Sequence, residues 1–236
     1  MGRLGFCWAL VAATLSAVPQ REAAEVLCSN TTDCTEAIQA ALDDPTQRHD
    51  VVLPAAGSGL PTSSGGETLW ITRPLRLNRS DVVFELRPGV VLQARRGWYH
   101  GHSDTVLKVS KASNISLVGP GAAIRMWRVD YRNLSLYSKA EWRAGLSVYS
   151  GERVSISGLT IAETGGDGVY IEGLKTGSVT NVTTEGCYRN GMSIISAENL
   201  LVEDCTFANT GARGRWNGGE TLTARTGGTA PRAGVE

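Results

Sequence analysis

The sequence has no net charge, because 23 Lys and Arg residues balance 23 Asp and Glu residues. A neutral chain has no field that would attract nucleic acid or an anionic membrane surface, so neither is predicted as a partner. The repeated segments of the second half contain no ten residues at helical spacing, which argues against helical and leucine-rich repeats. No membrane span is expected either, because the apolar run near the start is too short to cross a bilayer comfortably.

Residues 1–24 have the features of a secretory signal peptide. The segment MGRLGFCWALVAATLSAV has a basic start and an apolar stretch, and polar PQREAAE follows it. No clear cleavage motif is present, so cleavage is placed loosely between Ala17 and Glu25. We therefore expect a secreted, extracellular protein. The sequons that fit such a surface are predicted glycosylation sites: Asn30, Asn78, Asn114, Asn133 and Asn181.

A segment of 23 residues is repeated in the second half of the chain. Gly145, Gly168 and Gly191 lie 23 residues apart and open the segments GLSVYS, GVYIEG and GMSIIS. Within each copy, apolar residues alternate in twos, which is the period of a β-strand, and Gly, Asn and Ser mark the corners. Short strands in 23-residue coils, stacked about 4.8 Å apart, predict a parallel β-helix solenoid.

The alternation also predicts which side chains line the interior. The inward ladders are Leu146/Val169/Met192 and Val148/Ile171/Ile194, and the outward ones are Ser147/Tyr170/Ser193 and Tyr149/Glu172/Ile195. Segment 105–119 matches segment 144–158 at an offset of 39 residues, which is one 23-residue coil plus 16. We therefore expect an excursion from the coils near residues 126–142.

The predicted organisation is a signal peptide at 1–24, an N-terminal cap with an amphipathic helix at 25–50, and a parallel β-helix at 51–236. In the cap, TTDCTEAIQAALDD places four apolar residues on one helical face, namely Ala37, Ile38, Ala41 and Leu42. At the other end, AGVE at 233–236 resembles the opening of another coil after an insertion at 212–227. The β-helix is therefore interpreted as incomplete at its C-terminal end, as in a truncated product. A frayed natural tail is the alternative.

Four cysteines remain once Cys7 in the predicted signal peptide is set aside. Cys28 and Cys34 are close in sequence and are the best disulfide pair. Cys205 falls on an inward ladder and is expected to be a buried small hydrophobe. Cys187 lies several residues away in phase, so a bond between Cys187 and Cys205 is not favoured.

The segments DCTEAIQAALDD, VVLPAAGSG and LWITRPLRLNRSDVVFELRPGVVLQA resemble the opening of secreted right-handed β-helix proteins of the pectin-lyase-like superfamily. In that group a short helix caps the coils. GGDGVYI and RNGMSIISAENLLVEDCTFANT are similar to a branch of its eukaryotic and bacterial members, so the resemblance covers nearly everything after residue 30. It implies an all-β, right-handed parallel β-helix. The superfamily includes pectate lyases, polygalacturonases, uronan epimerases and proteins of unknown activity, so the resemblance does not single out one chemistry.

Candidate functional residues lie on the predicted outward faces and in the turns beside them. Positions that recur about every 4.8 Å along the coils suit an extended polysaccharide. Carboxylates transfer protons, arginines pair with uronate carboxylates, and aromatic rings stack on sugars. The predicted catalytic residues are Asp167, Glu172 and Arg189. The predicted substrate-binding residues are Lys108, Trp127, Tyr131, Arg143, Tyr149, Tyr170 and Arg232.

Each candidate also has an ordinary structural explanation. Asp167 precedes a glycine and suits a turn, and Glu172 suits a solvated strand. Arg189 suits a polar corner. His100 and His102 alternate without a third ligand nearby, so no metal site is predicted. No cofactor is identified, although Ca²⁺ is expected if the chemistry is that of a lyase.

Two functions fit the sequence. The first is a secreted protein that acts on a uronate-containing extracellular polysaccharide as a lyase, epimerase or hydrolase. The second is a non-catalytic carbohydrate-binding or surface β-helix. Polygalacturonase-like hydrolysis uses several Asp residues, whereas the chain offers only Asp167 at a comparable turn. The acidic Ca²⁺ cluster of a lyase is missing from the sequence as given, so the chain also fits an inactive fragment of an enzyme.

Overall fold

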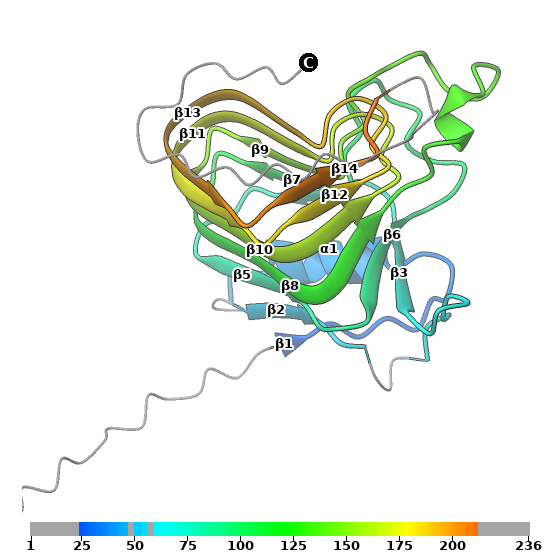
Figure 1. Cartoon of the computed structure of the whole chain (residues 1–236). Coiled ribbons are helices and arrows are strands. Elements are labelled where there is room, and N and C mark those ends of the chain that lie inside the picture. Colours follow the sequence, from blue (N-terminus) through cyan, green and yellow to red (C-terminus); the bar gives the residue numbers. More distant parts are fainter. Residues whose placement is uncertain (1–23, 47–49, 56–58, 212–236) are drawn as a thin grey trace, which may run out of the picture.

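The chain folds into stacked coils of β-strands, and the computed structural model describes residues 24–46, 50–55 and 59–211 (Figure 1). The helix α1 covers Thr35–Asp43, and a 3-10 helix covers Asp130–Arg132. The strands are β1 (Ala24–Glu25), β2 (Asp50–Leu53), β3 (Thr68–Thr72), β4 (Leu75–Leu77), β5 (Val82–Leu86), β6 (Val90–Ala94), β7 (Leu107–Ser110), β8 (Ser113–Arg125), β9 (Leu146–Tyr149), β10 (Glu152–Ala162), β11 (Val169–Thr180), β12 (Thr183–Glu185), β13 (Met192–Glu203) and β14 (Thr206–Ala208).

Three parallel sheets form the walls of the coils. Sheet 1 contains β4, β7, β9 and the first parts of β11 and β13. Sheet 2 contains β1, β2, β5, the first parts of β8 and β10, and the second parts of β11 and β13. Sheet 3 contains β3, β6, the second parts of β8 and β10, and β12 and β14. The later coils pass from sheet 1 to sheet 2 to sheet 3, which confirms the predicted all-β parallel β-helix.

The long strands turn from one sheet to the next at glycines. β10 bends at Gly158, where φ is +72°, and β11 bends at Gly173, where φ is +70°. A Cβ atom on Gly158 would lie 3.0 Å from the backbone of Pro120 in the neighbouring coil. A side chain at Gly158 would therefore meet both an unfavourable φ and a crowded neighbour. These corners let consecutive coils stack closely.

The strand register confirms the predicted inward ladders. The pairs Leu146–Val169, Val169–Met192, Val148–Ile171 and Ile171–Ile194 are all in register. Leu107 also pairs with Leu146. The longer coil therefore returns to the register of the shorter ones.

The outward ladders differ from prediction in two respects. Glu172 pairs with Ser196 rather than Ile195, because the register shifts where the strands bend. Ser147 and Ser193 are only 1% and 7% exposed. Ser147 Oγ lies 3.3 Å from Thr105 Oγ1 in the preceding turn, so a turn covers this part of the sheet.

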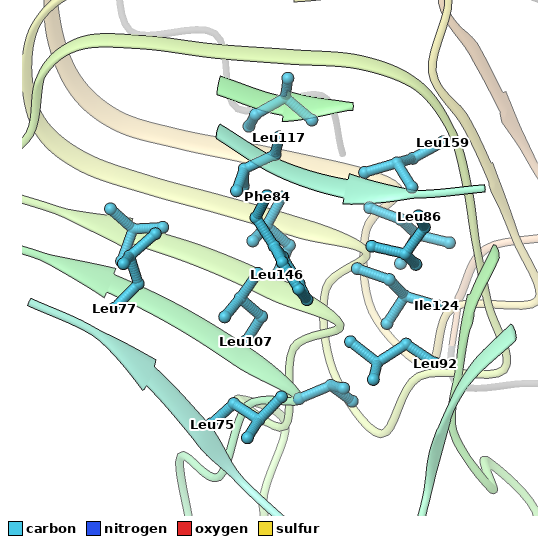
Figure 2. Close-up of a cluster of buried hydrophobic side chains, with 14 of the residues drawn as sticks. Leu75, Leu77, Phe84, Leu86, Leu92, Leu107, Leu117, Ile124, Leu146 and Leu159 are labelled. Carbon is cyan, nitrogen blue, oxygen red and sulfur yellow. The ribbon is translucent and has the colours of Figure 1, made fainter. Parts of the chain in front are cut away.

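The interior of the coils is one continuous apolar cluster. Figure 2 shows leucine and isoleucine side chains and Phe84 extending from several strands into the space between the sheets. Fully burying each such side chain contributes roughly 1.5–3 kcal/mol. Cys205 is also buried and has a free thiol, as its place on an inward ladder predicted.

Helix α1 lies against β4 at the N-terminal end of the coils. Of the predicted apolar face, Ile38, Ala41 and Leu42 are buried and Ala37 is partly buried. The Gln39 side chain accepts a hydrogen bond from the backbone N–H of Arg76 at 3.0 Å and donates one to its carbonyl at 2.8 Å. An amide side chain thus takes the place of a further strand at this edge.

The segment before the helix is closed by a disulfide. Cys28 and Cys34, the pair favoured by the sequence, are bonded, with Cα atoms 5.7 Å apart. Asp33 binds Arg73 and Arg95 with N–O distances of 2.9 and 2.6 Å. The cap is therefore attached to the coils by ion pairs as well as by apolar contacts.

The excursion predicted near 126–142 lies between β8 and β9, and we keep this name for residues 126–142. It contains the 3-10 helix and projects from the coils as the green loop in Figure 1. Trp127 Nε1 donates to the carbonyl of Ala94 at 2.6 Å, and Arg128 Nη2 donates to that of Gly211 at 2.5 Å. The excursion is therefore fastened both to an early coil and to the last described one.

Some predicted features lie outside the described residues. They are the signal peptide up to residue 23, Arg232, the insertion at 212–227 and the coil opening at 233–236. Within the described part of the chain, no helix is long and apolar enough to cross a membrane.

Candidate functional site

The candidate site lies on the outer side of sheet 1, beside the turns that lead into its strands. Strand register brings outward positions of consecutive coils into one column: Arg76, Lys108, Ser147, Tyr170 and Ser193. Along this column is a hollow of about 240 Å³, which we call the sheet-1 pocket. It is lined by Ser103, Thr105, Trp142, Ala144, Tyr149, Asp167 and Tyr170.

Two of the three aromatic residues that line the sheet-1 pocket are tyrosines. The ring centroids of Tyr149 and Tyr170 lie 5.4 Å apart, with the rings tilted by 37°. Lys108 Nζ lies 4.3 Å from the centroid of the Tyr149 ring. This is within the range of a cation–π contact. The pocket therefore has rings that can stack on a sugar and an ammonium group beside them.

Tyr170 and Glu172 form a hydrogen-bonded pair at the edge of this pocket. The Tyr170 hydroxyl donates to Glu172 Oε2 at 2.8 Å. Burial, with help from this hydrogen bond, raises the pKa of Tyr170 to about 12. The phenolate would lose hydration and face a carboxylate. Burial likewise raises the pKa of Tyr149. Both phenols are therefore neutral at neutral pH, and Glu172 itself is exposed.

Asp167 and Arg189, both predicted to be catalytic, bind each other. Arg189 Nε and Nη2 donate to the two carboxylate oxygens of Asp167 at 2.8 and 2.5 Å. The backbone N–H of Asn190 donates to the same carboxylate at 3.1 Å. Asp167 raises the pKa of Arg189. The bidentate pair occupies one edge of the guanidinium. Arg189 is therefore already paired within the fold, and its role in catalysis stays a prediction.

Arg143 and Tyr131 do not reach the surface of the pocket. Arg143 is 0% and Tyr131 is 7% exposed. The sequence placed Arg143 in the same turn phase as Arg189, but the excursion folds over it. Burial lowers the pKa of Arg143 and raises that of Tyr131. Both side chains are therefore buried within the fold, and their contact with a substrate stays a prediction.

Trp127 is also used within the fold. Besides its hydrogen bond to Ala94, its ring lies 4.9 Å from the guanidinium carbon of Arg96. It does not line the sheet-1 pocket. Of the predicted substrate-binding residues, Tyr149 and Tyr170 line the pocket and Lys108 lies beside it.

Three of the lining residues were not selected from the sequence: Ser103, Thr105 and Ala144. Trp142 is 53% exposed, and it ends the excursion whose dense aromatic residues were the available signal. Ser103 precedes the repeated segment, and Thr105 is the first residue of it. The Thr105 hydroxyl donates to the carbonyl of Ser103 at 3.4 Å and lies 3.3 Å from Ser147 Oγ, a contact between coils that no short-range pattern encodes.

A larger hollow of about 660 Å³ lies on the outer side of sheet 2, and we call it the sheet-2 trough. Register aligns small and apolar residues across it: Val83, Ser116, Ser155, Ser178 and Leu201. At its rim, Asn114 donates to Asp81 at 2.6 Å and accepts from Arg153 at 2.5 Å. The residues that line the trough include no aromatic ring.

Two further sets of predicted residues can be placed. Within the described residues, no group of three or more His, Cys, Asp or Glu side chains is able to hold a metal ion. The ring nitrogens of His100 lie 2.9 and 2.8 Å from the carbonyls of Leu136 and Gly97. All the sequon asparagines are exposed, including Asn114 at the rim of the sheet-2 trough, and their glycosylation stays a prediction.

Comparisons with known proteins agree with this fold. Residues 122–221 match the family model described as a right handed beta helix region. A structure from Parabacteroides merdae, provisionally described as a glycosyl hydrolase, has 17% identity and a TM-score of 0.62 over 80% of this chain and 88% of that one. The polygalacturonase of Erwinia carotovora ssp. carotovora has 17% identity and a TM-score of 0.61 over 85% of this chain and 58% of that one. No curated protein sequence matches the chain.

Proposed function

We propose that this right-handed parallel β-helix protein, with its pectin-lyase-like fold, acts on or binds an extracellular polysaccharide at the sheet-1 pocket. The observation that carries the proposal is the pocket itself, where Trp142, Tyr149 and Tyr170 meet Asp167 beside a column of aligned strands. Aromatic rings offer apolar faces to sugars. Neighbours described as a glycosyl hydrolase and a polygalacturonase support this substrate class.

The proposed polysaccharide contains uronate. Since Arg189 is bound to Asp167, the cation assigned to a uronate carboxylate is Lys108, whose ammonium lies over Tyr149. Glu172 is the proposed group that accepts or donates the proton in a lyase, epimerase or hydrolase reaction. The hydroxyl of Tyr170 holds the Glu172 carboxylate in place and remains a neutral donor.

Binding without turnover is the second candidate function, and one observation favours it. Asp167 is 1% exposed and paired with Arg189. Glu172 is then the one exposed acid of the predicted catalytic set. Hydrolysis by paired carboxylates needs two acids that face the same bond.

An extracellular location is part of the proposal. The Cys28–Cys34 disulfide supports an oxidising compartment. The exposed sequon asparagines support a secreted surface.

The test is incubation with polygalacturonate, alginate and a neutral glucan. New unsaturated uronate or new reducing ends indicate an enzyme, whereas retention on a glycan column without turnover indicates a binding protein. We expect Glu172→Gln to abolish turnover and retain binding. Tyr149→Ala should weaken binding by about 0.5–1.5 kcal/mol, the usual contribution of an aromatic contact. Failure to bind or cleave any of the three glycans would refute the proposal.

A further inference from the structure

Arg143 connects two segments that wall the sheet-1 pocket. Its guanidinium Nε donates to the carbonyl of Tyr99 at 2.7 Å. Nη2 donates to the carbonyl of Ser138 at 2.7 Å and to that of His100 at 3.3 Å. One buried side chain therefore bridges the turn before β7 and the excursion.

Two rings of the excursion complete the environment of this guanidinium. Its carbon lies 5.4 Å from the centroid of Tyr131 and 5.8 Å from that of Tyr137. The two rings meet edge to face, with centroids 5.1 Å apart. No ion pair among the described residues includes Arg143. Carbonyl dipoles from both segments stabilise the charge, and so do the two ring faces of the excursion.

The bridged segments lead directly into the pocket lining. Trp142 and Ala144 flank Arg143 in sequence, and both line the sheet-1 pocket. Ser103 and Thr105 follow the turn whose carbonyls accept hydrogen bonds from Arg143. Loss of the Arg143 hydrogen bonds would therefore make both the turn before β7 and the end of the excursion more mobile.

We propose that Arg143 is a positioning residue that holds Trp142, Ser103 and Thr105 against the tyrosines of the sheet-1 pocket before a ligand arrives. This inference rests on the proposed function, because it makes Trp142 a third ring in contact with the sugar. Fixing the walls in advance lowers the ordering cost of binding. The specificity of the pocket then depends on a residue that does not touch the ligand.

The first test needs no ligand and measures amide hydrogen exchange in Arg143→Lys. Lysine keeps the charge but cannot reproduce the planar fork of hydrogen bonds. Exchange in segments 99–105 and 130–142 should be about tenfold faster, the effect of losing one or two hydrogen bonds. Segment 169–180 should not change. The control is Arg87→Lys, because Arg87 is exposed and pairs with Glu85 outside the pocket. Unchanged exchange in both wall segments overturns the proposal.

The second test separates positioning from general stability by measuring affinity for a galacturonate hexamer and a neutral glucan hexamer. Arg143→Lys and Trp142→Ala should each lower the affinity about tenfold for whichever hexamer the wild type binds. The double variant should be little weaker than either one, because both changes remove the same contact. Fully additive losses overturn the proposal, since Arg143 would then act independently of Trp142.

The two tests also separate this inference from the proposed function. If the wild type binds neither hexamer, the sugar-binding role fails and the exchange measurement alone decides whether Arg143 orders the walls. If Arg143→Lys does not fold, Tyr137→Leu replaces it in both tests, because it removes one ring face and leaves the guanidinium present. A smaller increase in exchange of the same two segments supports the proposal, and no increase overturns it.

Discussion

The sheet-1 pocket and the sheet-2 trough lie on the same coils, yet they differ in what covers them. The trough is larger, at about 660 Å³ against about 240 Å³ for the pocket. Its outward hydroxyls form a row across three strands, at Ser116, Ser155 and Ser178. In the pocket, turns and the excursion leave Ser147 and Asp167 each only 1% exposed. The distinction shows that loops which bury polar groups, rather than the volume of a hollow, give one face of a solenoid its chemical character.

The largest expected effect tests the scaffold that both faces share. Val169→Asp should abolish folding, because an unpaired charge in the interior costs several kcal/mol. Tyr170→Asp on sheet 1 and Ser178→Asp on sheet 2 point outward and should still fold. Circular dichroism and urea unfolding provide the measurement. Equal damage from all three changes would show that the strand faces are wrongly assigned.

The next effect compares an arginine from each face. Arg189→Met should destabilise the fold by about 3 kcal/mol, the low end for breaking a buried pair, because Asp167 is left without its partner. Arg153→Met at the trough should cost less than about 1 kcal/mol, because Arg153 is 54% exposed. Urea unfolding measures both. Adding Asp167→Asn to Arg189→Met should restore part of the loss, and similar costs for the two arginines would contradict the comparison.

A smaller effect removes one hydroxyl from each face. Ser147→Ala should cost about 1 kcal/mol, because its contact with Thr105 is buried. Ser155→Ala in the trough should change stability by less than about 0.5 kcal/mol, as expected for a half-exposed position. The difference in urea midpoint between the variants is the measurement. A larger loss of stability for Ser155→Ala than for Ser147→Ala would contradict the comparison, because it would mean that the polar groups of the trough contribute more to stability than those of the pocket.

The smallest effect appears at alkaline pH. The pKa of Tyr170 in the folded chain is about 12, above its ordinary value of 10.0. The contribution of Tyr170 to stability is therefore complete below pH 10 and is lost as pH rises through about 12. Tyr170→Phe should reduce the alkaline loss of stability over this interval, whereas Ser178→Ala should leave it unchanged. Ultraviolet titration of the phenols checks the assignment, and a Tyr170 that ionises at its ordinary pH would contradict it.

Residues whose place depends on the coil period were predictable from sequence. Val169 and Ile171 fall on the interior ladders because a strand alternates in twos and each coil repeats after 23 residues. The period also located the excursion. Even Cys205 could be assigned to the interior from its phase alone.

Residues whose place depends on the excursion were not predictable in this way. The period gave Arg143 and Arg189 the same phase, but one is covered by a folded loop and the other is paired with Asp167. Glu172 pairs with Ser196, one residue beyond the predicted Ile195, because the register shifts where the strands bend. Trp142 entered the pocket through contacts between segments far apart in the chain. Local patterns carry no information about such contacts until the fold brings the segments together.

The coil that contains the excursion keeps the same strand register as the shorter coils. Leu107 pairs with Leu146, and Leu146 pairs with Val169. In evolutionary terms, a corner of this solenoid is a permissive site. A gene that gains codons there keeps its inherited ladder, because the coil has only to rejoin the stack. Descendants of one ancestor can therefore diverge in the loops at this corner while their frameworks stay superimposable.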